Sequence, residues 1–311
     1  MIKKILLSVG VFLLCVSVAL PMIVTLAFLP SQYSRTFFGE LDEKYERLRD
    51  VDGPRLVIVG GSSVAFGYDS ALLEELLGMP VVNFGLYADL GTKIMLDLSA
   101  RQLRRGDVVL LAPELDAQTL SLFFNGASAL KALDDRPSML FSIDGGDFES
   151  VWGGVWQHTA DKWKYLKEGA PDPAGIYNSA SFNDYGDIKA GLRPENTMTG
   201  GYDSQKTVDL SPSIYSEDFV AYLNDYIKAA RKKGADVYYT FCPVNAPSLD
   251  LSSVPQGEAD PLAWLSARLL AFLDERLDCP VVGSPADFVM REALFYDSNF
   301  HLNDTGVPLH T

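Results

Sequence analysis

The longest apolar run of the chain lies at its amino terminus. Residues 5–29 carry no charge and are almost wholly apolar, and they follow Lys3 and Lys4. The run exceeds the roughly 20 residues that a helix needs to cross a bilayer, and it is longer than the 7–15 apolar residues of a cleaved signal peptide. No small-x-small cleavage site follows, so residues 1–30 predict an uncleaved membrane anchor, with a cleaved signal as the alternative. The two lysines favour a cytoplasmic amino terminus, which places the bulk of the chain outside the cytoplasmic membrane.

Beyond this run, residues 31–54 are highly charged and predict a solvated helical stalk or linker. From residue 55 short apolar stretches alternate with amphipathic helical patterns. The expected strands are 56–59, 81–86, 108–112, 237–241 and 280–282. Such alternation predicts an α/β domain over 55–311, in which a mostly parallel sheet is covered by helices on both faces. The expected architecture is a three-layer α/β/α sandwich of the flavodoxin-like type.

The alternation is lost between residues 117 and 213. This region is too long for a structureless loop, so it predicts an insertion or cap with some helix of its own. Trp152, Trp156 and Trp163 fall here. We expect these side chains to fill the small core of the insertion, with a glycan-binding surface as the alternative.

Charge and cysteine content exclude several classes of function. The net charge is −15; residues 1–30 hold two lysines and no acid, so 24 of the 26 basic side chains remain against 41 acidic ones, a net −17. That charge argues against nucleic acid and against electrostatic binding to an anionic lipid surface. Three cysteines make no disulfide framework, and a bridge between Cys242 and Cys279 stays open. The three histidines are not clustered, so neither a metal nor another cofactor is expected.

Candidate chemistry lies at a strand end and near the carboxyl terminus. Ser62 follows the first strand at Gly60-Gly61, and α/β sheets bind their ligands just beyond the carboxyl ends of strands. His301 follows Asp297 by four residues. A histidine base oriented by an acid can activate a serine, which predicts Ser62, His301 and Asp297 as a catalytic set. A glycine-rich turn with a surface histidine is the plainer interpretation.

Other polar residues have more than one interpretation. Glu114 follows the third strand and is either a substrate contact, a buried acid or a solvated strand-end carboxylate; pointing inward, it would be protonated or paired. Asn183 lies in a segment, 177–187, whose amides, acids and aromatics suit sugar binding or an ordinary turn. Ser63 is an alternative nucleophile. His158 and His310 are expected at the surface.

Three short blocks resemble a known superfamily. They are Gly60-Gly-Ser-Ser63, Asn83-Phe-Gly85 and Asp297 to His301 followed by Leu-Asn. In this order they are similar to the motifs of the SGNH (GDSL-like) hydrolases, and more narrowly to the membrane-anchored bacterial members. The resemblance implies Ser62 as nucleophile and His301 as base, with the amides of Ser62 and Gly85 at the oxyanion.

The chain departs from this pattern at three places. Gly61 stands where the family usually has aspartate, and Ser298 stands at the usual position of the acid. Glu114 lies where the family usually carries Gly-x-Asn-Asp, so no asparagine is evident for the oxyanion hole.

The resemblance implies a serine esterase or O-acyltransferase that acts outside the cytoplasm on acyl, typically acetyl, esters of surface carbohydrate. Its partners would be an acylated carbohydrate or small ester and, as a candidate, a membrane acyltransferase. The alternative is a catalytically inactive domain that binds glycan or docks onto a membrane acyltransferase. A lipid esterase would require an exposed apolar cap near Ser62.

Overall fold

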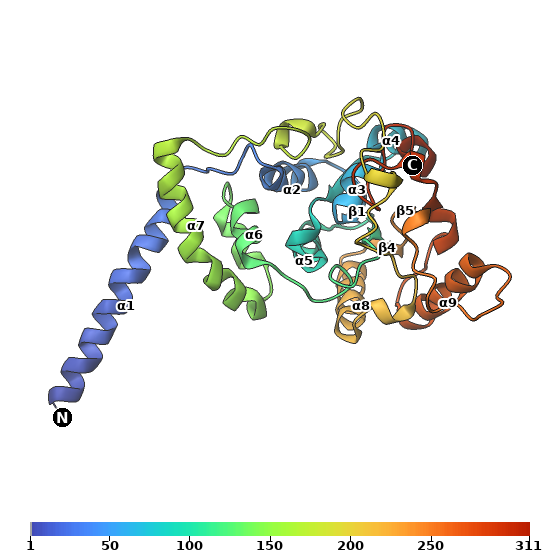
Figure 1. The fold of residues 1–311 in the computed structure, drawn as a ribbon. Coiled ribbons are helices and arrows are strands. Elements are labelled where there is room, and N and C mark those ends of the chain that lie inside the picture. Colours follow the sequence, from blue (N-terminus) through green and yellow to red (C-terminus); the bar gives the residue numbers. More distant parts are fainter. Residues whose placement is uncertain (1) are drawn as a thin grey trace.

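The computed structural model describes residues 2–311. Helix α1 (Ile2–Phe28) projects away from the body of the protein (Figure 1). Its Lys3–Pro21 stretch has a mean hydropathy of 2.2 and no part of that stretch is buried. This helix is long and apolar enough to cross a membrane, as the sequence predicts.

The centre of the body is a four-stranded parallel sheet in the order β2-β1-β3-β4. The strands are β1 (Leu56–Gly60), β2 (Val81–Gly85), β3 (Val108–Ala112) and β4 (Asp236–Tyr239). Gly60 pairs with Gly85 on one side and with Ala112 on the other, so the carboxyl ends of these three strands are level. From β1 the chain passes to β2 on one side of β1 and then crosses to β3 on the other side. The boundary between β1 and β3 is therefore a topological switch point, where α/β sheets bind ligands.

Apolar side chains cover both faces of the sheet. Val57 and Val59 join a large cluster, whereas Leu56 and Ile58 join a smaller one with Leu73 of α4. The opposite orientation of alternate strand residues explains this division. The α-helices of the body are α2 (Glu40–Asp50), α3 (Ser62–Gly67), α4 (Ser70–Leu77), α5 (Thr92–Gln102), α6 (Gly126–Ala132), α7 (Phe148–Glu168), α8 (Glu217–Lys232), α9 (Pro261–Arg276) and α10 (Val307–His310).

Local sequence signals set the helix ends. The Asp69 side chain accepts a hydrogen bond from the Leu72 amide at 3.0 Å and caps α4, and Gly78 ends that helix at φ +65°. Ser216 caps α8 in the same way. These residue types satisfy the unpaired amides and the left-handed turn at helix ends.

Two expected elements differ in the structure. Helix α2, expected as a solvated stalk, buries Leu41, Tyr45 and Leu48 against the body, because these apolar residues share one face of an otherwise charged helix. The expected fifth strand is reduced to a single bridge between Val281 and Tyr239. A separate two-stranded sheet forms from β5 (Val244–Asn245) and β6 (Val289–Met290).

The insertion folds mainly as α6 packed on α7, followed by irregular chain with short 3₁₀ turns. Figure 1 shows α7 beside the end of α1. Trp152, Trp156 and Trp163 are 61%, 67% and 49% exposed, so they do not form the core of the insertion. His158, expected at the surface, is buried instead because it contacts Asp134. Cys242 and Cys279 are both free and buried.

Candidate active site

Ser62 begins helix α3 directly after β1 and is only 4% exposed. The two glycines before it make this close-packed turn possible. A Cβ on Gly60 would lie 2.4 Å from the Ala112 carbonyl oxygen, and one on Gly61 would lie 2.8 Å from a Glu114 carboxylate oxygen. The turn therefore places the Ser62 hydroxyl at the carboxyl edge of the sheet, beside the end of β3.

The structure brings Ser62, His301 and Asp297 into one hydrogen-bonded chain. Ser62 Oγ lies 2.8 Å from His301 Nε2, and His301 Nδ1 lies 2.7 Å from Asp297 Oδ1. These distances suit proton transfer from a serine to a histidine that an acid orients. His301 is 7% exposed, so the pair of ring nitrogens is largely shielded from bulk water.

The turn before His301 explains the unusual spacing of the acid. Ser298 Oγ accepts hydrogen bonds from the amides of Phe300 and His301, at 3.2 and 3.1 Å. Ser298 thus shapes the turn, while Asp297 faces the ring. The His301 ring also stacks on Phe66 of α3, with centroids 4.0 Å apart and planes 7° from parallel. Helix α3 therefore carries both Ser62 and the Phe66 ring on which His301 stacks.

Tyr177 also contacts Asp297 and lines the cleft, although sequence analysis assigned it no separate role. Its hydroxyl donates a hydrogen bond to Asp297 Oδ2 at 2.6 Å. Burial raises the pKa of Asp297, but hydrogen bonds from His301 and Tyr177 outweigh it and hold that pKa below its usual value. Burial and the Asp297 charge raise the pKa of Tyr177, so the phenol remains a donor. The insertion thus contributes a second support for the acid.

The Glu114 carboxylate faces the Ser62 hydroxyl rather than solvent. It is 4% exposed, and its Oε1 accepts hydrogen bonds from Ser62 Oγ at 2.9 Å and from the Ser63 amide at 2.7 Å. Ser62 has one hydroxyl proton and two acceptors, Glu114 and His301. Glu114 is therefore not a solvated strand-end carboxylate; the carboxyl is buried and hydrogen-bonded.

Gly85 and Asn183 are not placed as expected. The Gly85 amide donates to Asn83 Oδ1 at 3.2 Å, and the glycine serves close packing, because a Cβ would lie 2.3 Å from Val64 Cβ. Asn183 Oδ1 accepts hydrogen bonds from the Tyr185 and Asp187 amides and closes a turn outside the cleft. The Gly85 amide is thus already hydrogen-bonded, and Asn183 does not line the cleft that contains Ser62.

The surroundings of Ser63, the alternative nucleophile, do not suit that role. Ser63 is fully buried and its hydroxyl has no hydrogen-bond partner among the described residues. The Ser62 amide, at the first position of α3, makes no hydrogen bond with the part of the chain that the structure describes. That amide is the donor left to face an oxyanion.

The hydrogen-bonded chain opens into a cleft of about 460 Å³. Tyr87 and Tyr177 line this cleft and also a neighbouring groove of about 280 Å³. The groove is otherwise mainly aromatic and proline-rich, lined by Tyr33, Thr36, Phe37, Phe38, Lys131, Tyr165, Pro171 and Pro173. An apolar surface thus adjoins the Ser62 cleft on one side.

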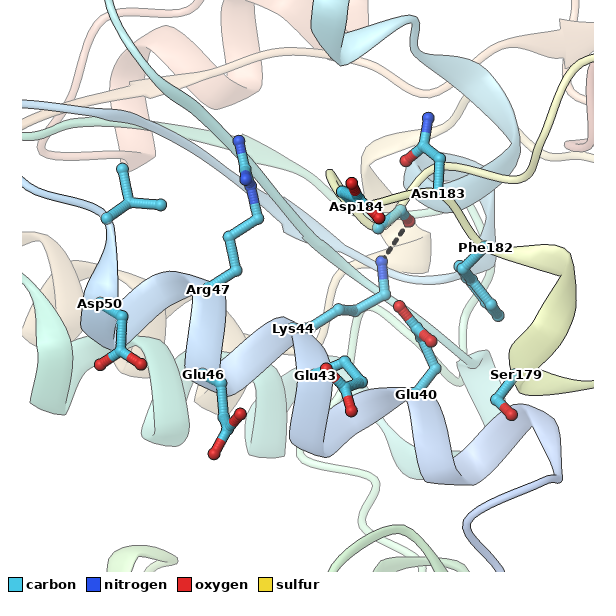
Figure 2. A pocket seen from close by; sticks show the side chains of 12 residues that line it. Glu40, Glu43, Lys44, Glu46, Arg47, Asp50, Ser179, Phe182, Asn183 and Asp184 are labelled. Atoms are coloured by element: carbon cyan, nitrogen blue, oxygen red, sulfur yellow. Dashed lines mark hydrogen bonds between the residues drawn. The ribbon is translucent and has the colours of Figure 1, made fainter.

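A larger pocket of about 550 Å³ lies along α2, away from Ser62. Figure 2 shows Lys44 at its base, where the ammonium donates to the Gly186 carbonyl oxygen and to that of Asn83. Burial lowers the pKa of Lys44 to about 8 and raises that of Glu40 to about 8. The buried lysine ties the 183–186 turn to β2. Ser179 lines this pocket but no histidine does, so a serine with a histidine base occurs in the Ser62 cleft and not here.

No protein-family model, curated protein or solved structure matches the chain.

Proposed function

We propose that the protein is a serine esterase or O-acyltransferase whose nucleophile is Ser62. The observation that carries the proposal is the hydrogen-bonded chain from Asp297 through His301 to Ser62. An unassisted serine hydroxyl is a poor nucleophile, and a base within hydrogen-bond distance is what activates it. Ser62 lies 239 positions before His301, and the two segments meet at the switch point of the sheet.

In this mechanism Ser62 Oγ bonds to the ester carbonyl carbon while His301 Nε2 takes the hydroxyl proton. The Ser62 amide faces the carbonyl oxygen as it gains negative charge. The imidazolium, stabilised by Asp297, then gives its proton to the leaving alcohol as the ester bond breaks. Water or a sugar hydroxyl, deprotonated by His301, attacks the acyl-Ser62 ester and releases the serine.

The fold we propose is the three-layer α/β/α sandwich of the SGNH hydrolases. The parallel sheet, the apolar clusters on its two faces and the serine at the carboxyl edge support this assignment. The departures at Gly61, Ser298 and Glu114 distinguish the chain from the usual pattern of that superfamily.

For the substrate we propose acyl, typically acetyl, esters of surface carbohydrate. The aromatic groove beside the cleft supports a sugar, because aromatic side chains provide flat apolar surfaces with polar tips. Helix α1, with Lys3 and Lys4 at its start, supports anchoring in the cytoplasmic membrane with the body outside. A membrane acyltransferase is the candidate partner in that location.

A fluorophosphonate probe tests the proposal, because it reacts with activated serines. The full chain in detergent is compared with Ser62→Ala and His301→Ala, and Ser63→Ala is the matched control. We expect labelling of the wild type and of Ser63→Ala, and loss of labelling in the other two. A folded wild type that is not labelled would overturn the proposal.

One observation favours a second candidate, a non-catalytic domain that binds glycan or docks onto a membrane acyltransferase. The Glu114 carboxylate accepts a hydrogen bond from Ser62 Oγ at 2.9 Å, close to the atoms on which negative charge would develop during acyl transfer. A buried anion there opposes the reaction. Binding of acetylated polysaccharide to an unlabelled but folded wild type is the result expected from this candidate.

A further inference from the structure

Helix α7 exposes a continuous apolar face. Phe148, Trp152, Trp156, Trp163 and Leu166 are all exposed, with Trp156 at 67%. Steps of four, four, seven and three residues place these side chains on one side of a helix. Three tryptophans on one exposed face form a contiguous apolar patch, which on a protein surface marks an interaction site.

The rest of α7 is fixed to the body. Val151 and Val155 are buried on the neighbouring face. On the same side the buried Lys162 donates a hydrogen bond to Asp134, and His158 Nε2 lies 3.2 Å from Asp134 Oδ1. Since a buried ion pair would have to break for α7 to rotate, the aromatic face cannot turn inward.

The aromatic face continues from helix α1. The Trp163 indole donates a hydrogen bond to Thr25 Oγ1 at 3.1 Å, and Lys162 Nζ donates to the Leu29 carbonyl oxygen at 3.4 Å. Figure 1 shows α7 running alongside the end of α1 and diverging from it. Exposed apolar side chains, such as Leu14 at 64%, cover α1 itself. The two apolar surfaces therefore meet at Trp163.

We propose that the aromatic face of α7 lies in the interfacial layer of the membrane that α1 spans. The inference rests on the anchoring part of the proposed function. Tryptophan concentrates at membrane–water interfaces, and a helix with one apolar face lies in that layer with the face buried among the lipids. The net charge of −17 on residues 31–311 leaves apolar insertion, rather than charge, as the attraction.

Attachment through both α1 and the aromatic face of α7 would hold the body of the protein in a single orientation on the membrane. Tyr33, just after α1, and Tyr165 of α7 both line the aromatic groove that adjoins the Ser62 cleft. The groove consequently opens close to the membrane surface, within reach of carbohydrate that is still attached to a lipid.

Depth-dependent quenching of tryptophan fluorescence tests this placement. The full chain is assembled into phosphatidylcholine nanodiscs with and without brominated acyl chains. One variant keeps Trp152 and another keeps Trp264 of α9, with every other tryptophan changed to Phe. We expect Trp152 to emit at short wavelength and to lose most of its emission to bromine, while Trp264 is not quenched.

A third variant separates the two possible failures. It carries Phe12→Trp in α1, with all four native tryptophans changed to Phe. Quenching at position 12 without quenching of Trp152 would overturn the interfacial placement and leave the anchor intact. No quenching at position 12 would overturn the anchor itself. Short-wavelength but unquenched Trp152, in discs holding two protein copies, would assign the face to a second copy of the chain and also overturn the inference.

Discussion

Replacing Glu114 with Gln should make Ser62 more reactive. The substitution removes the negative charge but keeps an oxygen that can accept a hydrogen bond from the Ser63 amide, which lies 2.7 Å from Oε1 in the wild type. Glu114 Oε1 lies 2.9 Å from Ser62 Oγ. The substitution therefore also removes a charged acceptor that competes with His301 for the Ser62 hydroxyl proton. His301 then becomes the preferred acceptor of that proton.

The size of the effect follows from the distance between charges. Negative charge on the reacting oxygen lies a bond or two beyond Ser62 Oγ, and two unit charges about 4 Å apart repel by about 1 kcal/mol in water and about 4 kcal/mol at an effective dielectric constant of 20. Glu114 is 4% exposed but the cleft is open to solvent. We therefore expect a gain of about 1–2 kcal/mol in the transition state, or about 5- to 30-fold in rate.

The assay is the second-order rate of fluorophosphonate labelling, with Asp116→Asn as the matched control. Asp116 also lines the cleft but makes no contact with Ser62, so its neutralisation should change the rate by less than about two-fold, as expected for a solvent-screened charge. An unchanged rate for Glu114→Gln would mean that the carboxyl carries no opposing charge. A loss of labelling as complete as in Ser62→Ala would make the carboxylate part of the catalytic machinery. Either result would refute the electrostatic reasoning.

Three further predictions concern positioning, stability and pH. Tyr177→Phe removes a donor to the ionised Asp297; such hydrogen bonds contribute about 1.5–3 kcal/mol to stability, so the unfolding midpoint should fall. Measured well below that midpoint, labelling should slow about ten-fold, the equivalent of about 1.4 kcal/mol, whereas an unchanged rate would exclude a positioning role. Asp107→Asn breaks a fully buried ion pair with Arg55 and should cost about 3–5 kcal/mol in urea unfolding; a loss below about 1 kcal/mol would contradict this. His310, expected at the surface, is partly buried, and burial lowers its pKa to about 4. His310 therefore binds a proton below about pH 6.5 in the unfolded chain but only below about pH 4 in the folded protein. As the pH falls from about 6.5 to about 4, the free energy of unfolding should decrease by at most about 3 kcal/mol. His310→Phe should flatten that decline in urea titrations, and an unaltered slope would rule the histidine out as its cause.

The sequence alone predicted the elements that depend on near neighbours. The apolar runs of β1, β2 and β3 and the length of α1 were evident from hydropathy, because each is set by residues that are adjacent or one turn apart. The cap at Asp69 and the stop at Gly78 are equally local. Local chemistry also identified Ser62 and His301, since a glycine turn after a strand and a histidine after an acid are short patterns.

The tertiary structure decided which side chains meet. The sequence indicated Asp297 as the acid but not how the turn directs it to His301, because that depends on the amides that Ser298 caps and on the stacking of His301 on Phe66. Nor could the sequence predict that Tyr177 donates a hydrogen bond to Asp297, or that Glu114 accepts one from Ser62. It also missed the burial of α2 and the exposure of the α7 tryptophans. These outcomes are set by contacts between residues tens to hundreds of positions apart, such as the 239 that separate Ser62 from His301. The energy of such contacts exists only once the sheet has fixed both partners in space.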